Sequence, residues 1–219
     1  MKNWKIQAVD SSGNGTGDYI ETDRTYTTSR NYVLKERDVR GKAYSYVWDD
    51  NEVKGLLQSV EDPSGRVTSY DYVANDDYLK KVTLDGDSVT YDYTAGNLLK
   101  KISSPKTTYS FGYDSFGNVT KSAIGSDPDA SGSITLAENT YNNNNGNLKN
   151  TVYGNGFKIG YSYDNYDRVT TVYHNGTTKF KWSYGADGQV GRHEDKINGK
   201  NYQYTYDLAG RLLRTDISD

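Results

Sequence analysis

Hydrophobic and polar residues alternate along most of this chain, and glycine, asparagine and aspartate interrupt the alternation at short intervals. Alternating runs bounded by turn residues predict β-strands with one apolar and one polar face, because successive side chains of a strand point to opposite sides. No window keeps apolar residues at helical spacing over several turns. The pattern therefore predicts an all-β fold of antiparallel hairpins with almost no helix.

Asn198-Gly199 lies between two alternating runs and predicts a hairpin with a type I′ turn, in which both residues have positive φ. Pairing outward from this turn separates the two faces. The first face is rich in tyrosine and carries Ile197, Tyr202, His193, Tyr204 and Tyr206. The second face is charged and carries Lys196, Asn201, Glu194, Gln203, Arg192 and Thr205.

Asn175-Gly176 predicts a second hairpin with a similar division. One face is expected to carry Tyr173, Thr171, Val169, Phe180 and Trp182. The other is expected to carry Lys179, Lys181, Thr170 and Thr177, together with His174.

The hairpins belong to a repeat of tyrosine, turn, strand, turn and strand. Repeats are expected to open near Tyr46, Tyr70, Tyr91, Tyr113, Tyr141, Tyr163, Tyr184 and Tyr206, at steps of 21 to 28 residues. Such a period is the signature of one supersecondary unit that is stacked many times. We predict a repeat region over residues 41–219, and a divergent repeat or a cap over residues 1–40.

The most regular repeats continue as Tyr-Asp-x-x-Gly followed by an aliphatic residue. The residues that carry the motif are Tyr113, Asp114, Gly117, Tyr206, Asp207 and Gly210, together with Tyr163 and Asp164 of a degenerate unit that has Asp167 in place of glycine. The tyrosine is expected on the packed face, the aspartate can accept hydrogen bonds from nearby backbone N–H groups, and glycine tolerates the left-handed conformation that closes the turn.

The amino-acid composition limits the classes of fold and function that the chain can have. The chain has 22 tyrosines, 22 glycines, no cysteine and a mean hydropathy of −0.90, so tyrosine rather than aliphatic residues must build the buried face of an extended molecule. The net charge of −3 comes from interspersed charges and gives no basic stripe for nucleic acid. No apolar run is long enough for a membrane span. The absence of cysteine suits a cytosolic protein or an exported bacterial protein without disulfides.

The units YDSFGNV, YDNYDRV and YDLAGRL, with RDVRGKAYSY and DPSGRVTSYDY before them, resemble the YD or Rhs repeats of bacterial polymorphic toxins, insecticidal toxin complexes and teneurins. YGNG at Tyr153 is similar to the wall-associated members. The resemblance covers residues 26–219. It implies a spiral of hairpins that forms part of a β-shell around a C-terminal effector domain, in a secreted or cell-surface bacterial protein. The partners implied are the remainder of the shell and that effector.

Toxin members also carry an aspartyl self-cleavage centre near the end of the shell. Asp62-Pro63-Ser64-Gly65 is superficially similar to part of that centre, but it lies between two repeats, and a plain turn is the simpler interpretation. We therefore expect no catalytic residues, no organic cofactor and no enzymatic activity.

Calcium is the one metal that the sequence suggests. The longest repeat contains the spacing of a calcium loop, with candidate oxygen ligands at Asp127, Asp129, Ser131, Ser133 and Glu138 and the sharp turn at Gly132. The alternative is a polar loop that binds no metal, because insertions between strands are commonly rich in Asp, Pro, Ser and Gly.

Rows of tyrosine beside Asp and Asn allow a second function, a carbohydrate-binding module that recognises cell-wall or host glycans. The competing interpretation is a cross-strand aromatic ladder that stabilises the sheet. The histidines His174 and His193 lack a second metal-ligating partner in the sequence, and we expect structural roles for both.

Overall fold

The computed structural model describes residues 4–28, 30–38, 40–49, 54–74 and 76–219. Every regular element among these residues is a β-strand, which confirms the all-β prediction. The described part of the chain accordingly contains no helix that could cross a membrane. The chain forms two compact units, Met1–Thr108 and Tyr109–Asp219.

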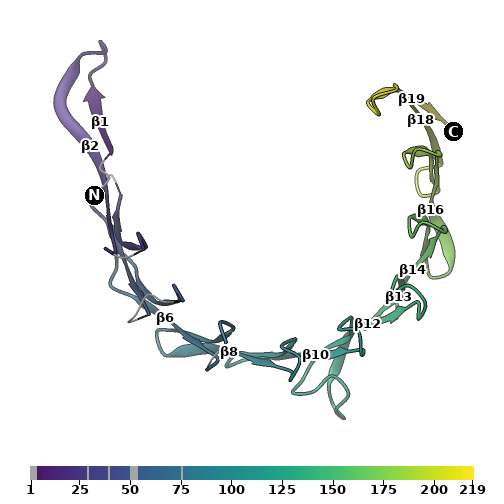
Figure 1. Cartoon of the computed structure of the whole chain (residues 1–219), viewed down its shortest axis with the longest axis horizontal. Coiled ribbons are helices and arrows are strands. Elements are labelled where there is room, and N and C mark those ends of the chain that lie inside the picture. Colours follow the sequence, from purple (N-terminus) through teal and green to yellow (C-terminus); the bar gives the residue numbers. More distant parts are fainter. Residues whose placement is uncertain (1–3, 29, 39, 50–53, 75) are drawn as a thin grey trace. The chain divides into compact units, whose positions relative to one another are not determined.

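The strands of the first unit follow one another in antiparallel hairpins (Figure 1). They are β1 (Trp4–Val9), β2 (Gly15–Tyr26), β3 (Val33–Arg37), β4 (Ala43–Trp48), β5 (Leu57–Glu61), β6 (Val67–Tyr72), β7 (Leu79–Leu84), β8 (Asp87–Tyr93) and β9 (Leu99–Ser103). The long strand β2 pairs with β1 along its first part and with β3 along its last part.

The second unit continues the same pattern with antiparallel neighbours in chain order. Its strands are β10 (Thr108–Tyr113), β11 (Val119–Ile124), β12 (Ile134–Tyr141), β13 (Leu148–Tyr153), β14 (Lys158–Tyr163), β15 (Val169–His174), β16 (Thr177–Tyr184), β17 (Val190–Asp195), β18 (Lys200–Tyr206) and β19 (Leu212–Ser218).

Each unit is a single layer of sheet. Among the described residues of a unit, strands contact only the strands next to them in the chain, and the ribbon bends gradually along the strand order (Figure 1). Among the described residues no second layer covers either face, and the buried apolar side chains are Ala123 and Pro128. The sheet must therefore be stabilised by contacts between neighbouring strands rather than by an enclosed core.

Successive turns of such a meander alternate between two edges of the sheet. In the second unit one edge carries the turns at residues 114–118, 142–147, 164–168, 185–189 and 207–211. The strands that enter these turns end in tyrosine, so we call this the aromatic edge. The other edge carries the turns at 125–133, 153–157, 175–176 and 196–199.

The type I′ turn predicted at Asn198-Gly199 is wrong. Gly199 has φ +67°, but Asn198 does not have positive φ, and Asp195 pairs with Lys200 across a longer loop. The Asp195 carboxylate accepts hydrogen bonds from the backbone N–H groups of Ile197 and Asn198 and so stabilises that loop. The real register differs from the predicted one by an even number of residues, so the predicted faces are retained for the paired residues, and His193 pairs with Tyr202. Lys196 and Ile197 lie in the loop.

The second hairpin turn is confirmed, but its predicted faces are wrong. Asn175 and Gly176 have φ +48° and +82°, as a type I′ turn requires. A register shift then follows between Val172 and Tyr173, which places Phe180 opposite Val172. As a result Phe180 and Trp182 share a face with His174, while Tyr173 and Thr171 lie on the face of Lys181.

Candidate functional site

An aromatic residue ends each strand that enters the aromatic edge, and it connects one repeat to the repeat before it. Tyr163 shows the geometry. The register of β14 and β15 shifts directly before Tyr163, which pairs with Val169, the first residue of the outgoing strand. The Tyr163 hydroxyl donates a hydrogen bond to the backbone carbonyl of Leu148, the first residue of the preceding outgoing strand, at 2.9 Å. We call this bond a brace.

At least seven braces occur among the described residues. The donor and acceptor pairs are Trp48 and Val33, Tyr72 and Leu57, Tyr93 and Leu79, Tyr141 and Val119, Tyr163 and Leu148, Tyr184 and Val169, and Tyr206 and Val190. Trp48 donates through its indole N–H where the other repeats use a phenol. The last position of the incoming strand therefore requires a long aromatic side chain with a hydrogen-bond donor at its tip, and either tyrosine or tryptophan can supply it.

Three of the predicted repeat tyrosines lie two residues before the brace. The sequence pattern indicated Tyr46, Tyr70 and Tyr91, whereas the donors are Trp48, Tyr72 and Tyr93. Tyrosines two residues apart share a face, so Tyr70 and Tyr72 both point to the aromatic side of β6. The aliphatic residue that opens each outgoing strand is the signal that would have found the correct position, because it pairs with the brace residue.

Burial raises the pKa of the Tyr72, Tyr93 and Tyr163 hydroxyls above the ordinary value. Their rings pack on the sheet, and water reaches the phenol less well than in a free chain. These hydroxyls are therefore neutral, and able to donate, throughout the ordinary pH range.

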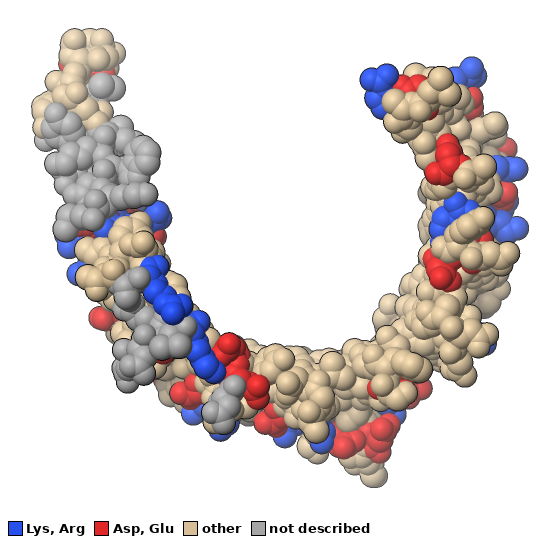
Figure 2. All heavy atoms as spheres, viewed as in Figure 1, with Lys and Arg blue, Asp and Glu red and all other residues tan. Residues whose placement is uncertain are grey.

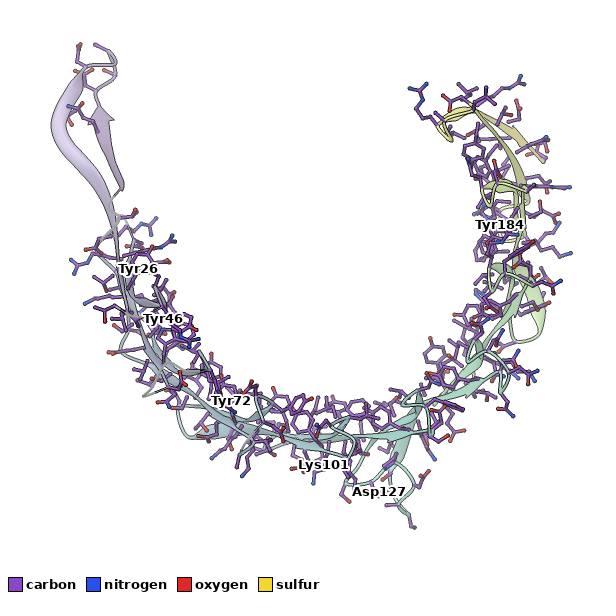
Figure 3. The ribbon with its side chains drawn as sticks, in the orientation of Figure 1. Tyr26, Tyr46, Tyr72, Lys101, Asp127 and Tyr184 are labelled. Carbon is purple, nitrogen blue, oxygen red and sulfur yellow. The ribbon has the colours of Figure 1, made fainter. Side chains whose placement is uncertain are left out.

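Figure 3 shows the two faces of the sheet. In the first unit Tyr46 and Tyr72 point to the aromatic face, while Lys101 lies on the opposite face, where its ammonium pairs with Asp92 at 2.7 Å. In the second unit Tyr184 points to the aromatic face, and Asp127 lies in a loop that projects from the other side of the ribbon. Hence one face is aromatic and the other carries cross-strand ion pairs.

The aspartate of the Tyr-Asp-x-x-Gly motif organises its turn as predicted. The Asp207 carboxylate accepts hydrogen bonds from the N–H groups of Ala209 and Arg211, and its Oδ2 also accepts from the Arg211 guanidinium. Gly210 has φ +79°. The same backbone contacts to a carboxylate recur at Asp10, Asp38, Asp62, Asp114 and Asp164.

These turns bear on two further expectations from the sequence. Asp62-Pro63-Ser64-Gly65 forms the same turn, with Gly65 at φ +84°, so its interpretation as a turn is confirmed. The turns at Asp10 and Asp38 show that residues 1–40 contain the same hairpin corner as the region that follows.

These hydrogen bonds also change the acidity of the aspartates. Donation from the Arg211 backbone and side chain lowers the pKa of Asp207. The Arg168 guanidinium lowers the pKa of Asp164, and the Asn118 side chain lowers that of Asp114. The ionised carboxylate is thus the form that holds each turn closed.

Arg168 links two repeats at the aromatic edge. Its guanidinium pairs with Asp164 at 2.7 Å, and its central carbon lies 4.3 Å from the centre of the Tyr184 ring in the next repeat. A cation over the face of a tyrosine is an attractive contact. Together with the Tyr184 brace, it ties the turn at 164–168 to strand β16.

A ladder of stacked rings crosses the aromatic face from β15 to β18. Trp182 and His193 are parallel within 1° at 5.0 Å, and His193 and Tyr202 are stacked at 5.4 Å. Further ring contacts join His174 to Phe180, Phe180 to His193, and Tyr202 to Tyr204. The geometry supports the predicted cross-strand ladder, in which the faces of the central rings are occupied by neighbouring rings.

Both histidines belong to this ladder. His193 was expected among tyrosines, and it lies between Trp182 and Tyr202. His174 was expected on the charged face, and this is wrong, because its ring contacts Phe157 and Phe180. The register shift in β15 and β16 is the cause. Neither ring is placed by these contacts beside a serine nucleophile or a second metal-ligating group.

The candidate calcium residues occupy two different elements. Asp127 and Asp129 lie in the loop between β11 and β12, whereas Glu138 lies within β12 opposite Lys121. The Lys121 ammonium lies 3.2 Å from Asp129 and 3.1 Å from Glu138, and these contacts raise the pKa of Lys121. Ser133 donates to the backbone carbonyl of Asp127.

Among the described residues, no group of three or more acidic or histidine side chains is arranged to hold a metal ion. The Lys121 ammonium instead bridges two of the expected ligands. Calcium binding by Asp127, Asp129, Ser131, Ser133 and Glu138 stays a prediction, and a bound ion would have to displace that ammonium.

The same loop has a packing role. Pro128 is buried, and its Cγ lies 3.5 Å from the point where a side chain on Gly112 would begin. Ser110 and Ala123, which pair with each other across β10 and β11, are also buried. The insertion of the long repeat thus packs against the sheet beside small residues, which leave room for it.

Comparison with known proteins shows the fold. No protein-family profile matches this chain, and no curated protein sequence matches it. Solved structures do match. The crystal structure of TcdB2-TccC3-Cdc42 has a TM-score of 0.60 and 15% identity, over 96% of this chain and 13% of that chain. The Tc holotoxin pore of Photorhabdus luminescens has a TM-score of 0.61 and 13% identity, over 94% of this chain and 13% of that chain.

A third structure, TcdB2-TccC3 without its hypervariable C-terminal region, has a TM-score of 0.59 and 16% identity, over 96% of this chain and 13% of that one. These chains share the antiparallel, all-β fold with the present protein. Its length corresponds to a small part of theirs, 13% in each case.

Proposed function

We propose that this chain is a non-enzymatic structural segment of a secreted or cell-surface bacterial YD/Rhs-repeat protein, and that it builds part of a β-shell that encloses or displays a C-terminal toxin or effector domain. The brace carries this proposal. Successive repeats such as those ending at Tyr163, Tyr184 and Tyr206 each donate a hydrogen bond to the repeat before them at an equivalent position, so a sheet of this kind grows by adding hairpins and needs no enclosed core.

The fold match supports the same function. The sequence resembles the YD repeats of insecticidal toxin complexes, and the solved structures that share its fold are Tc toxin assemblies. In the proposed parent, the partners of this segment are the neighbouring hairpins of the shell and the effector. The charged face and the aromatic face then have different surroundings, one facing solvent and one facing the interior.

A single layer of β-sheet is suited to forming the wall of a shell. A hairpin repeat covers area with few residues, because each strand uses neighbouring strands for its hydrogen bonds and leaves both faces available. The rings of both histidines contact other aromatic rings, and the turn aspartates with lowered pKa values, such as Asp207, accept hydrogen bonds within their own turns. A passive role is consistent with both observations.

Small-angle X-ray scattering on the purified chain tests the architecture. A compact domain of 219 residues would have a radius of gyration of about 17 Å. A wall segment should exceed that value clearly and give a pair-distance distribution with a long tail. A radius of gyration near the compact value would contradict the proposal, because it would indicate a closed barrel or sandwich.

Limited proteolysis of the full-length parent tests encapsulation. The segment C-terminal to the repeats should resist a protease that digests it readily when it is expressed alone. Equal cleavage rates in the two contexts would show that the repeats do not enclose it.

Glycan recognition through the tyrosine-rich face stays an alternative prediction. Stacking on a sugar requires a free ring face, and in the ladder the faces of Trp182, His193 and Tyr202 contact one another. The structure therefore favours the shell role for this face.

A further inference from the structure

In at least three repeats, the residue directly before the brace acceptor contacts the aromatic ring of the brace donor. The contacting residue and the donor ring are Tyr32 and Trp48, Tyr78 and Tyr93, and Arg168 and Tyr184. The hydrogen bond brings the donor ring to the acceptor carbonyl, and the contacting residue is the neighbour of that acceptor along the chain. The brace therefore fixes which two side chains meet.

Tyr78 and Tyr93 are the pair of this kind in which both members are phenols. Their ring centres lie 5.2 Å apart, and their planes are inclined at 37°. At this separation carbon atoms of the two rings are close to van der Waals contact. Tyr78 is 39% exposed, so an oxidant in solution can reach it, whereas Tyr93 is half-buried.

Both rings are held in place by hydrogen bonds. The Tyr93 hydroxyl donates to the Leu79 carbonyl at 2.8 Å, and the Val73 N–H donates to the Tyr78 carbonyl at 2.9 Å and closes the turn before β7. Burial raises the pKa of Tyr93, and the hydroxyls of Tyr91 and Tyr78 raise it further, as expected for phenols that lie near one another. A bond between the two rings therefore requires little movement of the strands.

An acidic group beside Tyr78 is paired with a lysine. The Asp77 carboxylate lies 3.0 Å from the Lys54 ammonium. Acidic and basic side chains also lie next to each other on the visible surface of the first unit around β6 (Figure 2). A mixed surface of this kind neither attracts nor repels charged molecules strongly. Access of an oxidant to Tyr78 therefore depends on exposure rather than on charge.

The chain lacks the residue that usually forms covalent cross-links. It has 22 tyrosines and no cysteine, so no disulfide can join its strands. Oxidation of a phenol gives a phenoxyl radical, and two such radicals couple through the ring carbons ortho to their hydroxyls. A pair of tyrosines held in contact can therefore take the place of a disulfide in an oxidising environment.

We propose that Tyr78 and Tyr93 form a dityrosine cross-link when a haem peroxidase and hydrogen peroxide act on the chain. Each phenol loses one electron and one proton, and the two radicals form a C–C bond between their rings. The two ring hydrogens then move to the phenol oxygens and restore both hydroxyls. The electrons and protons removed from the phenols reduce one hydrogen peroxide to two waters.

The cross-link closes a covalent loop within one repeat. It joins the end of β8 to the turn before β7, and it stabilises this hairpin by restricting the unfolded chain, as a disulfide does. The site involves two rings of a single chain and does not depend on the shell proposal. Failure of the shell experiments leaves it intact, and its own failure leaves the shell function intact.

Peroxidase treatment of the full chain at low protein concentration tests the site. The monomer, isolated by size exclusion, should show dityrosine fluorescence, and peptide mass spectrometry should find Tyr78 joined to Tyr93 with the loss of two hydrogen atoms. In urea above the unfolding midpoint the same pair should lose its preference, because proximity is lost. Cross-links found only between chains, or only at exposed tyrosines such as Tyr166, would overturn the proposal.

Tyr78→Phe should reduce the intramolecular cross-link to background, because the radical at this position cannot form. Tyr32→Phe is the matched control, since Tyr32 has the equivalent place in another repeat, where its partner is Trp48. The control should keep the wild-type yield. Equal yields in the two variants, or equal yields in the folded and the unfolded wild type, would contradict the proposal.

Discussion

At the scale of the residue, the aromatic side chain of each brace donates a hydrogen bond to a backbone carbonyl of the preceding repeat. Tyr163 and Tyr161 lie on the same strand and the same face, but only Tyr163 donates such a bond among the described contacts. The pair therefore separates the value of the hydrogen bond from the value of the ring.

Tyr163→Phe should lower the free energy of unfolding by about 1 kcal/mol, the net worth of a partly buried hydrogen bond. Tyr161→Phe should leave it within about 0.5 kcal/mol of the wild type. Urea unfolding followed by circular dichroism measures both. Equal losses in the two variants would show that the brace contributes nothing of its own.

The turn aspartates make the stability of the folded chain depend on pH. Their pKa values are lowered in the folded chain below the ordinary 3.8, so they contribute stability above that pH and lose the contribution as pH falls through the folded pKa. Unfolding midpoints in urea should be flat from about pH 7 to pH 5 and should fall below about pH 4. Asp207→Asn should reduce the acid-induced loss, because an amide still accepts but does not titrate. A midpoint that rises below pH 4 would contradict this assignment.

At the scale of the element, the hairpin corner needs one residue in the left-handed region. Gly117 and Gly210 have φ +85° and +79°, and the equivalent places in two other turns are filled by Asn97 and Asp167, each at φ +61°. Glycine, asparagine and aspartate are the residues that accept this conformation with least strain. The substitutions that make some repeats look degenerate therefore preserve the corner.

Gly117→Val should lower the free energy of unfolding by more than about 1 kcal/mol, because a β-branched residue is strained at positive φ. Gly117→Asn should cost clearly less. Gly96→Ala is a control, since Gly96 does not have positive φ and has room for a methyl group. If valine and asparagine were equally tolerated at position 117, the corner would not depend on its backbone conformation.

At the scale of the whole molecule, the last strand is exposed along its whole length. Every residue of β19 is exposed, with Leu213 at 66% and Ile217 at 61%, and within the described chain this strand pairs with β18 alone. An apolar strand with a free edge is a template for pairing with another strand. In the proposed shell, the next hairpin would occupy this edge.

The purified chain should therefore self-associate through β19. Sedimentation velocity should show a concentration-dependent increase in mass, and Leu213→Lys should suppress it, because a lysine on an edge strand opposes edge-to-edge pairing. Leu136→Lys, on an interior strand that is paired on both sides, is the comparison. A strictly monomeric wild type at high concentration would contradict the prediction.

Local chemistry is what the sequence by itself determined. The alternation set the strands, and Asp207, Gly210, Asn175 and Gly176 set their turns through side-chain acceptors and positive φ that depend on a few neighbouring residues. The tyrosine period set the repeat. Each of these signals is contained within one hairpin, which is why a single sequence reveals it.

Tertiary structure decided the register. A shift of one residue between Val172 and Tyr173 places His174 on the aromatic face. The shift before each brace makes Trp48 and Tyr72 the hydrogen-bond donors, and not the tyrosines two positions earlier. Such a shift depends on how two strands pack along their whole length, and on the hydrogen bond that the aromatic side chain makes with a third strand. The contact of Lys121 with Glu138 also depends on the strand register, because the spacing of residues in a loop does not reveal which residues pair across two strands.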